Sequence, residues 1–286
     1  LSAMFKNYYY DAEAIDIDQG LGGTTIPVRK VRENLNGFGF ATKYSPWKEA
    51  YIRISYERTA RIPTTDEIFG NFANIRPNFN LRPERSDNLN LGIGYNDDIL
   101  GFEEISIAVD LFVRNQENLI RVAPFGAESA RYVNEEVVDG KGIALTMDAS
   151  PNANFKVKSS LTYQSNLINT PNANGAVNTS VQVPNQPILF GNLSSSYELV
   201  DIFNDKLDLQ PLVNYFFTDR YSINEVSDLN TANPEFVIPA QHLVDAGFIV
   251  TPNIENLTFS LTVRNVFDGL IYDNFRIPRP GRNYSL

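Results

Sequence analysis

The chain has 286 residues, a formal net charge of −10, no Cys and a single His. The lack of Cys excludes disulfides, zinc ribbons, iron–sulfur clusters and thiol nucleophiles, and the acidic balance argues against nucleic acid as a partner. No stretch approaches the roughly 18 consecutive apolar residues of a membrane-spanning helix, a result that leaves membrane-spanning strands open. Because the sequence opens at Leu1 without an initiator Met or a signal peptide, we expect a piece of a longer protein.

Apolar and polar residues alternate with a period of two along most of the chain, which predicts half-buried β-strands. In one such segment Ile105, Ile107 and Val109 fall on one face, while Ser106 and Asp110 fall on the other. We expect about eleven strands of roughly 9–11 residues, the length that crosses a bilayer when tilted. In chain order the pattern marks residues 52–56, 89–95, 105–113, 143–147, 155–163, 189–199, 206–217, 244–250 and 257–265.

The connections between these segments alternate between short and long. The short turns, rich in Pro, Asn, Asp or Gly, fall at residues 46–48, 96–102, 150–154, 201–205 and 251–256. The long segments are 13–34, 61–85, 117–139, 167–186, 222–236 and 268–280. This regularity is typical of an outer-membrane barrel, which has short periplasmic turns and long external loops.

A soluble antiparallel β-protein is the alternative, since alternation by itself fits any half-buried sheet. The content of the two faces favours the membrane. Lys156 and Lys158 suit a wet lumen, and Tyr95 and Tyr163 lie towards the ends of apolar faces, where a membrane barrel carries its aromatic girdles.

Four segments carry a resemblance to a known family. Residues 56–70 contain Arg61, Pro63, Glu67 and Phe69 in the order R-x-P, E-x-[FY]-G, and residues 76–88 contain the P-E pair Pro83 and Glu84 before a strand. Residues 263–268 read V-R-N-V-F-D, and residues 272–282 read Y-D-N-F-R-I-P-R-P-G-R. In this order and spacing the chain resembles the TonB-dependent outer-membrane receptors.

The resemblance implies an all-β fold, an antiparallel transmembrane barrel of which this chain supplies about 11–12 of the family's 22 strands. Residues 1–286 are then the C-terminal portion of the barrel, residues 1–10 are an upstream barrel strand, and the plug domain and TonB box lie outside this chain. The motif residues Arg61, Pro63, Glu67, Pro83, Glu84, Arg264, Asn265, Pro280, Gly281 and Arg282 are expected to fix loop geometry, with Arg61 paired to Glu84 or Glu67.

No catalytic constellation stands out, and no enzyme activity, metal or cofactor is expected. A Ser-His-Asp reading of His242 lacks identifiable partners. Aromatic residues in long loops offer contact area at low entropy cost, so they are candidates for ligand binding, with the lipid interface as the alternative use. The candidate ligand-binding residues are Arg61, Phe69, Phe125, Tyr132, Phe216, Tyr221, Phe236 and Phe275.

By resemblance, such a receptor lies in the outer membrane of a Gram-negative bacterium and imports a scarce nutrient, a ferric siderophore or similar, with energy delivered through TonB. Its expected partners are outer-membrane lipid and lipopolysaccharide, its own plug and N-terminal barrel strands, the TonB complex and a small-molecule or oligomer nutrient. Three alternatives remain open: a passive porin, an oligosaccharide- or peptide-importing receptor, and a soluble carbohydrate-binding β-protein.

Overall fold

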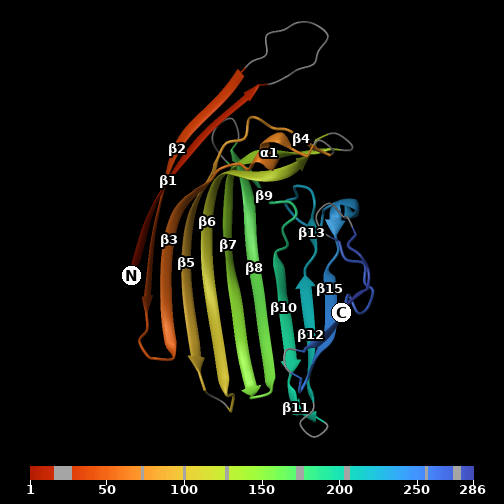
Figure 1. Cartoon of the computed structure of the whole chain (residues 1–286). Helices are drawn as coiled ribbons and strands as arrows, with labels where there is room; N and C mark the ends of the chain where they lie inside the picture. Colours follow the sequence, from red (N-terminus) through yellow and green to blue (C-terminus); the bar gives the residue numbers. More distant parts are fainter. Residues whose placement is uncertain are drawn as a thin grey trace.

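A computed structural model describes residues 1–15, 28–71, 74–98, 101–125, 129–171, 177–202, 207–254, 257–272 and 278–286. Within these ranges the chain forms one large curved sheet (Figure 1). Twelve strands follow one another in sequence order, each antiparallel to the next, so the sheet is an up-and-down meander. They are β1 (Ser2–Ile15), β2 (Val28–Tyr44), β3 (Ala50–Arg61), β5 (Glu84–Asp97), β6 (Glu104–Pro124), β7 (Ala130–Asn152), β8 (Phe155–Pro171), β10 (Leu189–Tyr197), β12 (Leu207–Thr218), β15 (Gln241–Pro252), β16 (Phe259–Arg264) and β17 (Asn283–Ser285).

Short elements join this wall at its edges and ends. Strand β4 (Ile75–Arg76) runs parallel to β7, β9 (Val177–Gln182) pairs with β8, and β11 (Leu199–Asp201) pairs with β12. Strands β13 (Tyr221–Ser222) and β14 (Val237–Ile238) form a separate pair. The helical segments described are α1 (Thr65–Phe69) and the 3₁₀ turn η1 (Pro234–Phe236), and neither is long or apolar enough to cross a membrane. The all-β antiparallel prediction is confirmed.

One face of the wall is apolar and exposed. The register places Ile52 opposite Ile93, Ile93 opposite Val109, and Val109 opposite Leu145, and these side chains continue one band from strand to strand. Ile52, Ile93 and Leu145 are all exposed in the isolated chain. An exposed apolar band of this extent is unstable in water and matches the lipid-facing surface of a membrane barrel.

The opposite face of the wall is polar. Arg53 Nη2 on β3 donates to Asp110 Oδ1 on β6 at 2.7 Å, passing over Gly92 of the intervening strand β5. A Cβ at Gly92 would lie 2.4 Å from Asp110 Oδ1, so the glycine makes room for this ion pair. Lys158 and Asp148 form a second pair between β7 and β8. Such charges suit a hydrated lumen.

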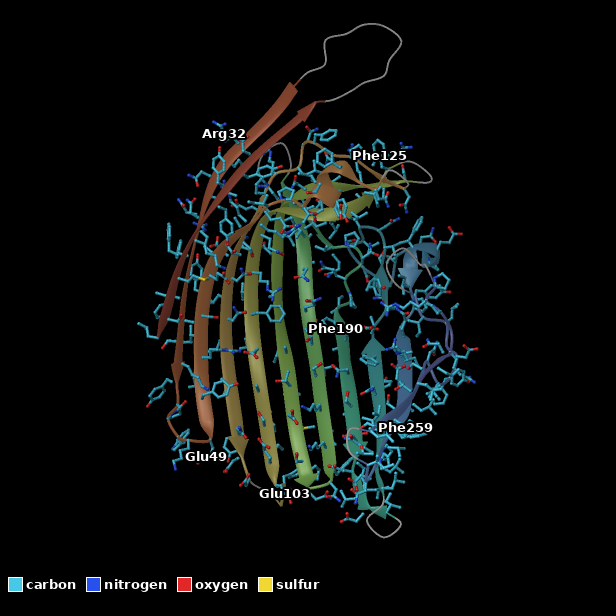
Figure 2. The ribbon with its side chains drawn as sticks, in the orientation of Figure 1. Arg32, Glu49, Glu103, Phe125, Phe190 and Phe259 are labelled. Atoms are coloured by element: carbon cyan, nitrogen blue, oxygen red, sulfur yellow. The ribbon has the colours of Figure 1, made fainter. Side chains whose placement is uncertain are left out.

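The two ends of the wall differ, as Figure 2 shows: Glu49 and Glu103 lie at the end with short turns, and Arg32 and Phe125 lie at the other. The short turns match the prediction, but the long segments are more ordered than predicted. Residues 117–139 are mainly a hairpin continuing β6 and β7, paired from Leu119 with Glu135 to Pro124 with Ala130. The expected strand length of roughly 9–11 residues is therefore wrong for β6 and β7, which have 21 and 23 residues. The alternation of apolar and polar residues is weak in this hairpin because it extends beyond the membrane, where neither of its faces contacts lipid.

The best-buried side chains of the described chain lie at the end that carries the long segments. Val138, Ile168 and Val183 form a core to which Leu119 and Val181 are added, and Val138 is 0% exposed. Leu81, Pro83 and Ile238 are likewise fully buried. We call the described parts of residues 61–85, 117–138, 168–188 and 219–240 the external head. This part of the molecule, rather than the wall, has a packed interior.

Candidate ligand-binding site in the external head

Arg61 ties the first segment of the external head together. Its Nε and Nη2 donate to Glu84 Oε2 and Oε1, each at 2.7 Å, and its Nη1 donates to both carboxylate oxygens of Glu67 at 2.9 Å. The expected pairing of Arg61 with Glu84 or Glu67 is thus present with both. Hydrogen bonding to Glu84, against the opposing cost of burial, raises the pKa of Arg61 above its ordinary value. The guanidinium therefore stays charged and holds two carboxylates at a fixed separation.

The two carboxylates have further roles. Glu67 is the third residue of α1, and its Oε2 accepts from Thr64 N at 2.8 Å, which with the Thr64 hydroxyl completes a capping box for this short helix. Glu84 Oε1 also accepts from Ile120 N of β6 at 2.6 Å. Arg61, Glu67 and Glu84 thereby connect β3, α1, β5 and the β6–β7 hairpin, which gives these motif residues a structural role.

The segment after α1 is fastened onto the same hairpin. Asn134 on β7 accepts from Arg82 N at 2.9 Å and donates to Arg82 O at 3.0 Å, while Asn78 Nδ2 donates to Tyr132 O at 2.7 Å. Between these contacts Leu81 and Pro83 are fully buried. The hydrogen bonds satisfy the backbone of a segment that lacks regular structure, so residues 74–85 form a fixed surface.

Aromatic side chains project from this fixed surface. Phe69 is 41% exposed and meets the ring of Phe79 edge-on, with 5.6 Å between centroids. Phe125 is 45% exposed, and the Arg131 guanidinium lies 4.6 Å from its ring centroid. Because β4 pairs with β7 from Ile75 opposite Ala130, the segment that carries Phe69 and the hairpin that carries Phe125 and Tyr132 belong to one unit. Exposed rings beside a cation form a surface suited to flat, anionic ligands.

The other candidate aromatics lie in the last part of the external head. Tyr221 on β13 is 6% exposed, which leaves little of it for contact with a ligand from solvent, whereas Phe236 in η1 is exposed. Arg121 joins this part to the hairpin through ion pairs with Glu135 and Glu225. Phe275 lies outside the described residues.

The motif at the end of β16 forms a turn. Asn265 has a φ of +54°, is buried, and exchanges hydrogen bonds with the backbone of Gly269 at 2.8 and 2.9 Å. Asp268 Oδ1 accepts from Arg282 N at 2.7 Å, and a Cβ at Gly281 would lie 2.6 Å from that oxygen. Asn tolerates this left-handed conformation and Gly permits the close approach, so both residue types follow from the geometry of the turn.

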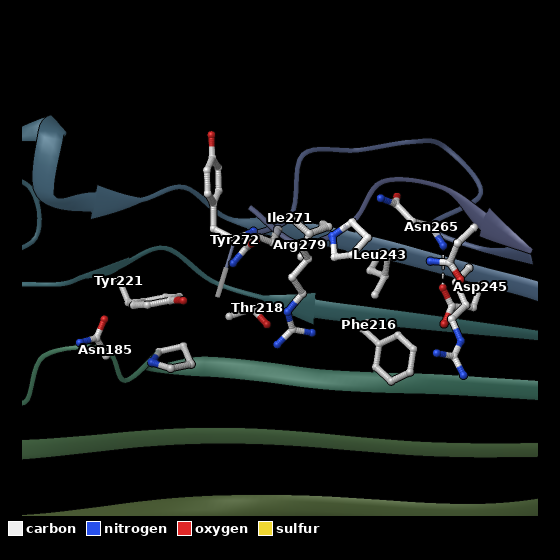
Figure 3. A pocket seen from close by; sticks show the side chains of 15 residues that line it. Asn185, Phe216, Thr218, Tyr221, Leu243, Asp245, Asn265, Ile271, Tyr272 and Arg279 are labelled. Carbon is white, nitrogen blue, oxygen red and sulfur yellow. Dashed lines mark hydrogen bonds between the residues drawn. The ribbon is translucent and has the colours of Figure 1, made fainter. Parts of the chain in front are cut away.

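A cavity of about 770 Å³ lies beside this turn (Figure 3). Arg264, Asn265 and Pro280 of the motif line it together with Phe216 and Tyr221. Two further polar lining residues, Gln241 and Asp245, could not be singled out from the sequence because they occupy ordinary positions in the alternation of a strand. His242 stands apart from the cavity: it accepts or donates a 2.7 Å hydrogen bond with Tyr215 Oη and contacts the Phe217 ring.

The architecture defines a class of protein, the membrane β-barrels whose lipid-facing wall carries an elaborate external head. The family described as "TonB dependent receptor-like, beta-barrel" matches residues 15–266. The chain belongs to this family, whose members reside in the outer membrane of Gram-negative bacteria and are transporters rather than enzymes.

Solved structures of the family share the fold at low sequence identity. The ferric-catecholate import receptor Fiu of E. coli is 18% identical with a TM-score of 0.63, over 99% of this chain and 40% of its own. The FrpB iron transporter of Neisseria meningitidis is 16% identical with a TM-score of 0.61, over 90% of this chain and 39% of its own. The copper transporter OprC is 15% identical with a TM-score of 0.68, over 99% and 43%. This chain therefore spans about two fifths of their length, and no curated protein matches it.

Proposed function

We propose that this chain forms the external recognition surface and part of the lumen wall of a receptor that imports a scarce nutrient with energy delivered through TonB. The observation that carries the proposal is the packed external head, in which a core around Val138 and the Arg61 ion pairs hold exposed Phe69 and Phe125 in place. Ordering a flexible loop on binding costs conformational entropy. A surface that is already ordered before the ligand arrives avoids this cost, so it binds the ligand more tightly.

A passive porin is a weaker explanation of these features. A diffusion channel needs a closed wall and a hydrated lumen, and neither requires buried Leu81, Val138 or Ile238 beyond the membrane. A soluble carbohydrate-binding protein is weaker still, because it would leave the apolar band on β3 to β8 in water.

A ferric siderophore is the ligand class we propose first. Many ferric siderophores are anionic and carry planar aromatic or carbonyl donor groups around the metal, which suit contact with the Phe69–Phe79 pair and with Arg131 beside the Phe125 ring. Of the three structural neighbours described above, two are named for iron or a ferric catecholate and the third is named a copper transporter, so the fold by itself selects no cargo. Oligosaccharides also stack on aromatic rings, so they are the second ligand class in the uptake experiment described below.

The remaining proposed partners are the plug, the N-terminal barrel strands, the TonB complex and lipopolysaccharide. A polar network on the same face as the apolar band supports the last of these. Asp139 accepts from Asn115 and Asn169 at 2.7 and 2.5 Å, and Arg58 donates to Asp87 at 2.8 Å, all beyond the external edge of the band. Polar groups facing lipid are stable at the headgroup level, where lipopolysaccharide offers sugars and phosphates.

Uptake by the complete gene product tests the proposal. In a Gram-negative host lacking its own iron receptors, radiolabelled ferric chelates and labelled oligosaccharides are supplied with TonB present or deleted. We expect saturable uptake of a ferric chelate that disappears without TonB. Uptake that persists without TonB and rises linearly with concentration would establish the porin alternative instead.

Two variants tie that uptake to the external head. Phe69→Ala and Phe125→Ala should each raise the half-saturating chelate concentration about tenfold, the effect of losing about 1.4 kcal/mol of stacking. Phe259→Ala is the matched control, because Phe259 is also an exposed phenylalanine but belongs to β16 at the other end of the wall (Figure 2). Equal effects of all three substitutions would refute the recognition surface.

A further inference from the structure

The cavity of about 770 Å³ in Figure 3 is a second candidate site, separate from Phe69 and Phe125 of the external head. Its floor is the outer part of β12 and β15, and the chain after β16 closes it from the side. Phe216 and Leu243 are paired in the register of the two strands, so their side chains lie side by side on this floor. The volume falls in the range of small-molecule sites, roughly 300–1,000 Å³.

Two guanidinium groups enter this cavity from different elements. Arg264 ends β16, and Arg279 reaches from the last loop towards Thr218 and Phe216 (Figure 3). Within the described part of the chain neither guanidinium has a carboxylate within 4 Å, whereas Arg53, Arg58 and Arg61 are each ion-paired. The chain as a whole has a net charge of −10, so two arginines without a carboxylate partner among the described residues make this cavity locally positive.

The backbone around both arginines is fixed. Arg279 N donates to Ile271 O at 2.8 Å, and Tyr272 N donates to the buried Gln241 side chain at 2.6 Å. Asp245 is the one acidic residue among the described residues that line the cavity; it accepts from Asn265 N at 2.8 Å and so holds the turn next to Arg264. Its charge disfavours an anion at the Arg264 end and leaves Arg279, which is on the side of Thr218 and Tyr221, as the stronger anchor.

We propose that this cavity binds a small molecule bearing a carboxylate on a flat, apolar body. The carboxylate pairs with Arg279, with Arg264 adding attraction at longer range, and the body lies against Phe216 and Leu243. Guanidinium groups match the two oxygens of a carboxylate, and the aromatic wall supplies the buried contact area. The inference rests on the proposed import function, since the cavity would be a binding site for an anionic nutrient on the lumen side of the wall.

The test uses the complete gene product, with its plug, purified in detergent. Salicylate is the carboxylate probe, and salicylamide, its neutral counterpart of nearly the same shape, is the control probe. Binding is followed by saturation-transfer NMR and titrated to obtain dissociation constants. We expect salicylate to bind at least tenfold more tightly than salicylamide.

Substitutions then locate the site. Arg279→Gln should weaken salicylate binding about tenfold and Arg264→Gln less, with salicylamide unaffected. Arg282→Gln is the matched control, because Arg282 is an exposed arginine three residues further on that does not line the cavity. Equal binding of the two probes, or equal losses in Arg279→Gln and Arg282→Gln, would overturn the proposal. So would salicylate binding that emerges only after deletion of the plug, because the plug would then be the occupant.

The two proposals fail in different ways. If the protein shows TonB-dependent uptake but does not bind salicylate, the cavity proposal is refuted and the import function is supported. Absence of energised uptake for every ligand class removes the import function, whatever the probes bind.

Discussion

Replacing Arg61 with Ala should loosen the external head without opening the wall. The substitution deletes four hydrogen bonds and leaves Glu67 and Glu84, each with a side chain only 12% exposed, facing each other without a cation. A broken buried ion pair costs about 3–5 kcal/mol. Because the Arg61 side chain is 43% exposed, solvent reduces this cost, and we expect a loss of about 2–3 kcal/mol.

Hydrogen exchange in the complete receptor measures this loss directly. The amide of Ile120 is the sharpest reporter, since it donates to Glu84 Oε1 at 2.6 Å, and the amide of Ile68 reports on α1 through its bond to Thr64 O. A local opening made easier by about 2–3 kcal/mol accelerates exchange by roughly 30- to 160-fold. Amides of the wall, such as those of β10, should exchange as before.

Two further variants separate charge from geometry. Arg61→Lys keeps a cation but loses the planar fork, so its exchange rates should fall between those of the wild type and Arg61→Ala. Arg76→Ala deletes a nearby exposed arginine that forms no ion pair within the described residues, and it should change nothing. If Arg61→Ala left the Ile120 amide as protected as Arg76→Ala does, the ion pairs would not be what holds the head together.

Three other substitutions test separate parts of the molecule. Leu111→Arg places a charge on the lipid-facing band and should cost about 2–4 kcal/mol in urea unfolding of the complete barrel in lipid, whereas Thr162→Arg on the polar face should cost far less. Gly281→Ala forces a Cβ against Asp268 and should speed proteolytic cleavage near Arg282, while Gly269→Ala, with its nearest atom at 3.7 Å, should not; equal cleavage would contradict the close approach. Val138→Ala opens a cavity in the external core and should lower local stability by about 2–3 kcal/mol, seen as faster exchange of neighbouring head amides; unaltered exchange would mean that this core does not order the head.

The wall could be predicted from the sequence because a single rule governs it. Between lipid and lumen each side chain faces one solvent or the other, so alternation in residues 105–113 is sufficient to identify a strand. Beyond the membrane that rule no longer holds: the sequence predicts a long loop for residues 117–139, whereas the described residues of this range pair as a hairpin. The Arg61 ion pairs could be predicted from the sequence, because Glu67 and Glu84 are acidic motif residues in the segment of Arg61 and in the segment that follows it.

The candidate sites were less accessible to prediction because they depend on tertiary neighbours. Tyr221 is typical of an exposed loop aromatic in sequence, yet its pairing in β13 and the segment that follows bury it. The cavity joins Gln241 and Asp245 of β15 to Arg279 of the last loop, residues whose proximity follows from a turn fixed by Asn265. A left-handed residue in that turn leaves no periodic signal in the sequence.

The strictly sequential order of the wall bears on how such a molecule forms. Each interior strand of the twelve-strand meander pairs with the strands before and after it in that meander, as β6 pairs with β5 and β7. Contacts of this kind have short loop-closure distances, so hairpins can assemble one after another, each new strand pairing with the backbone edge that the previous strand leaves open. The external head joins residues as distant as Arg121 and Glu225, and its closure must therefore come after the strands between them are in place. Recognition would then be the last property that the folding chain acquires.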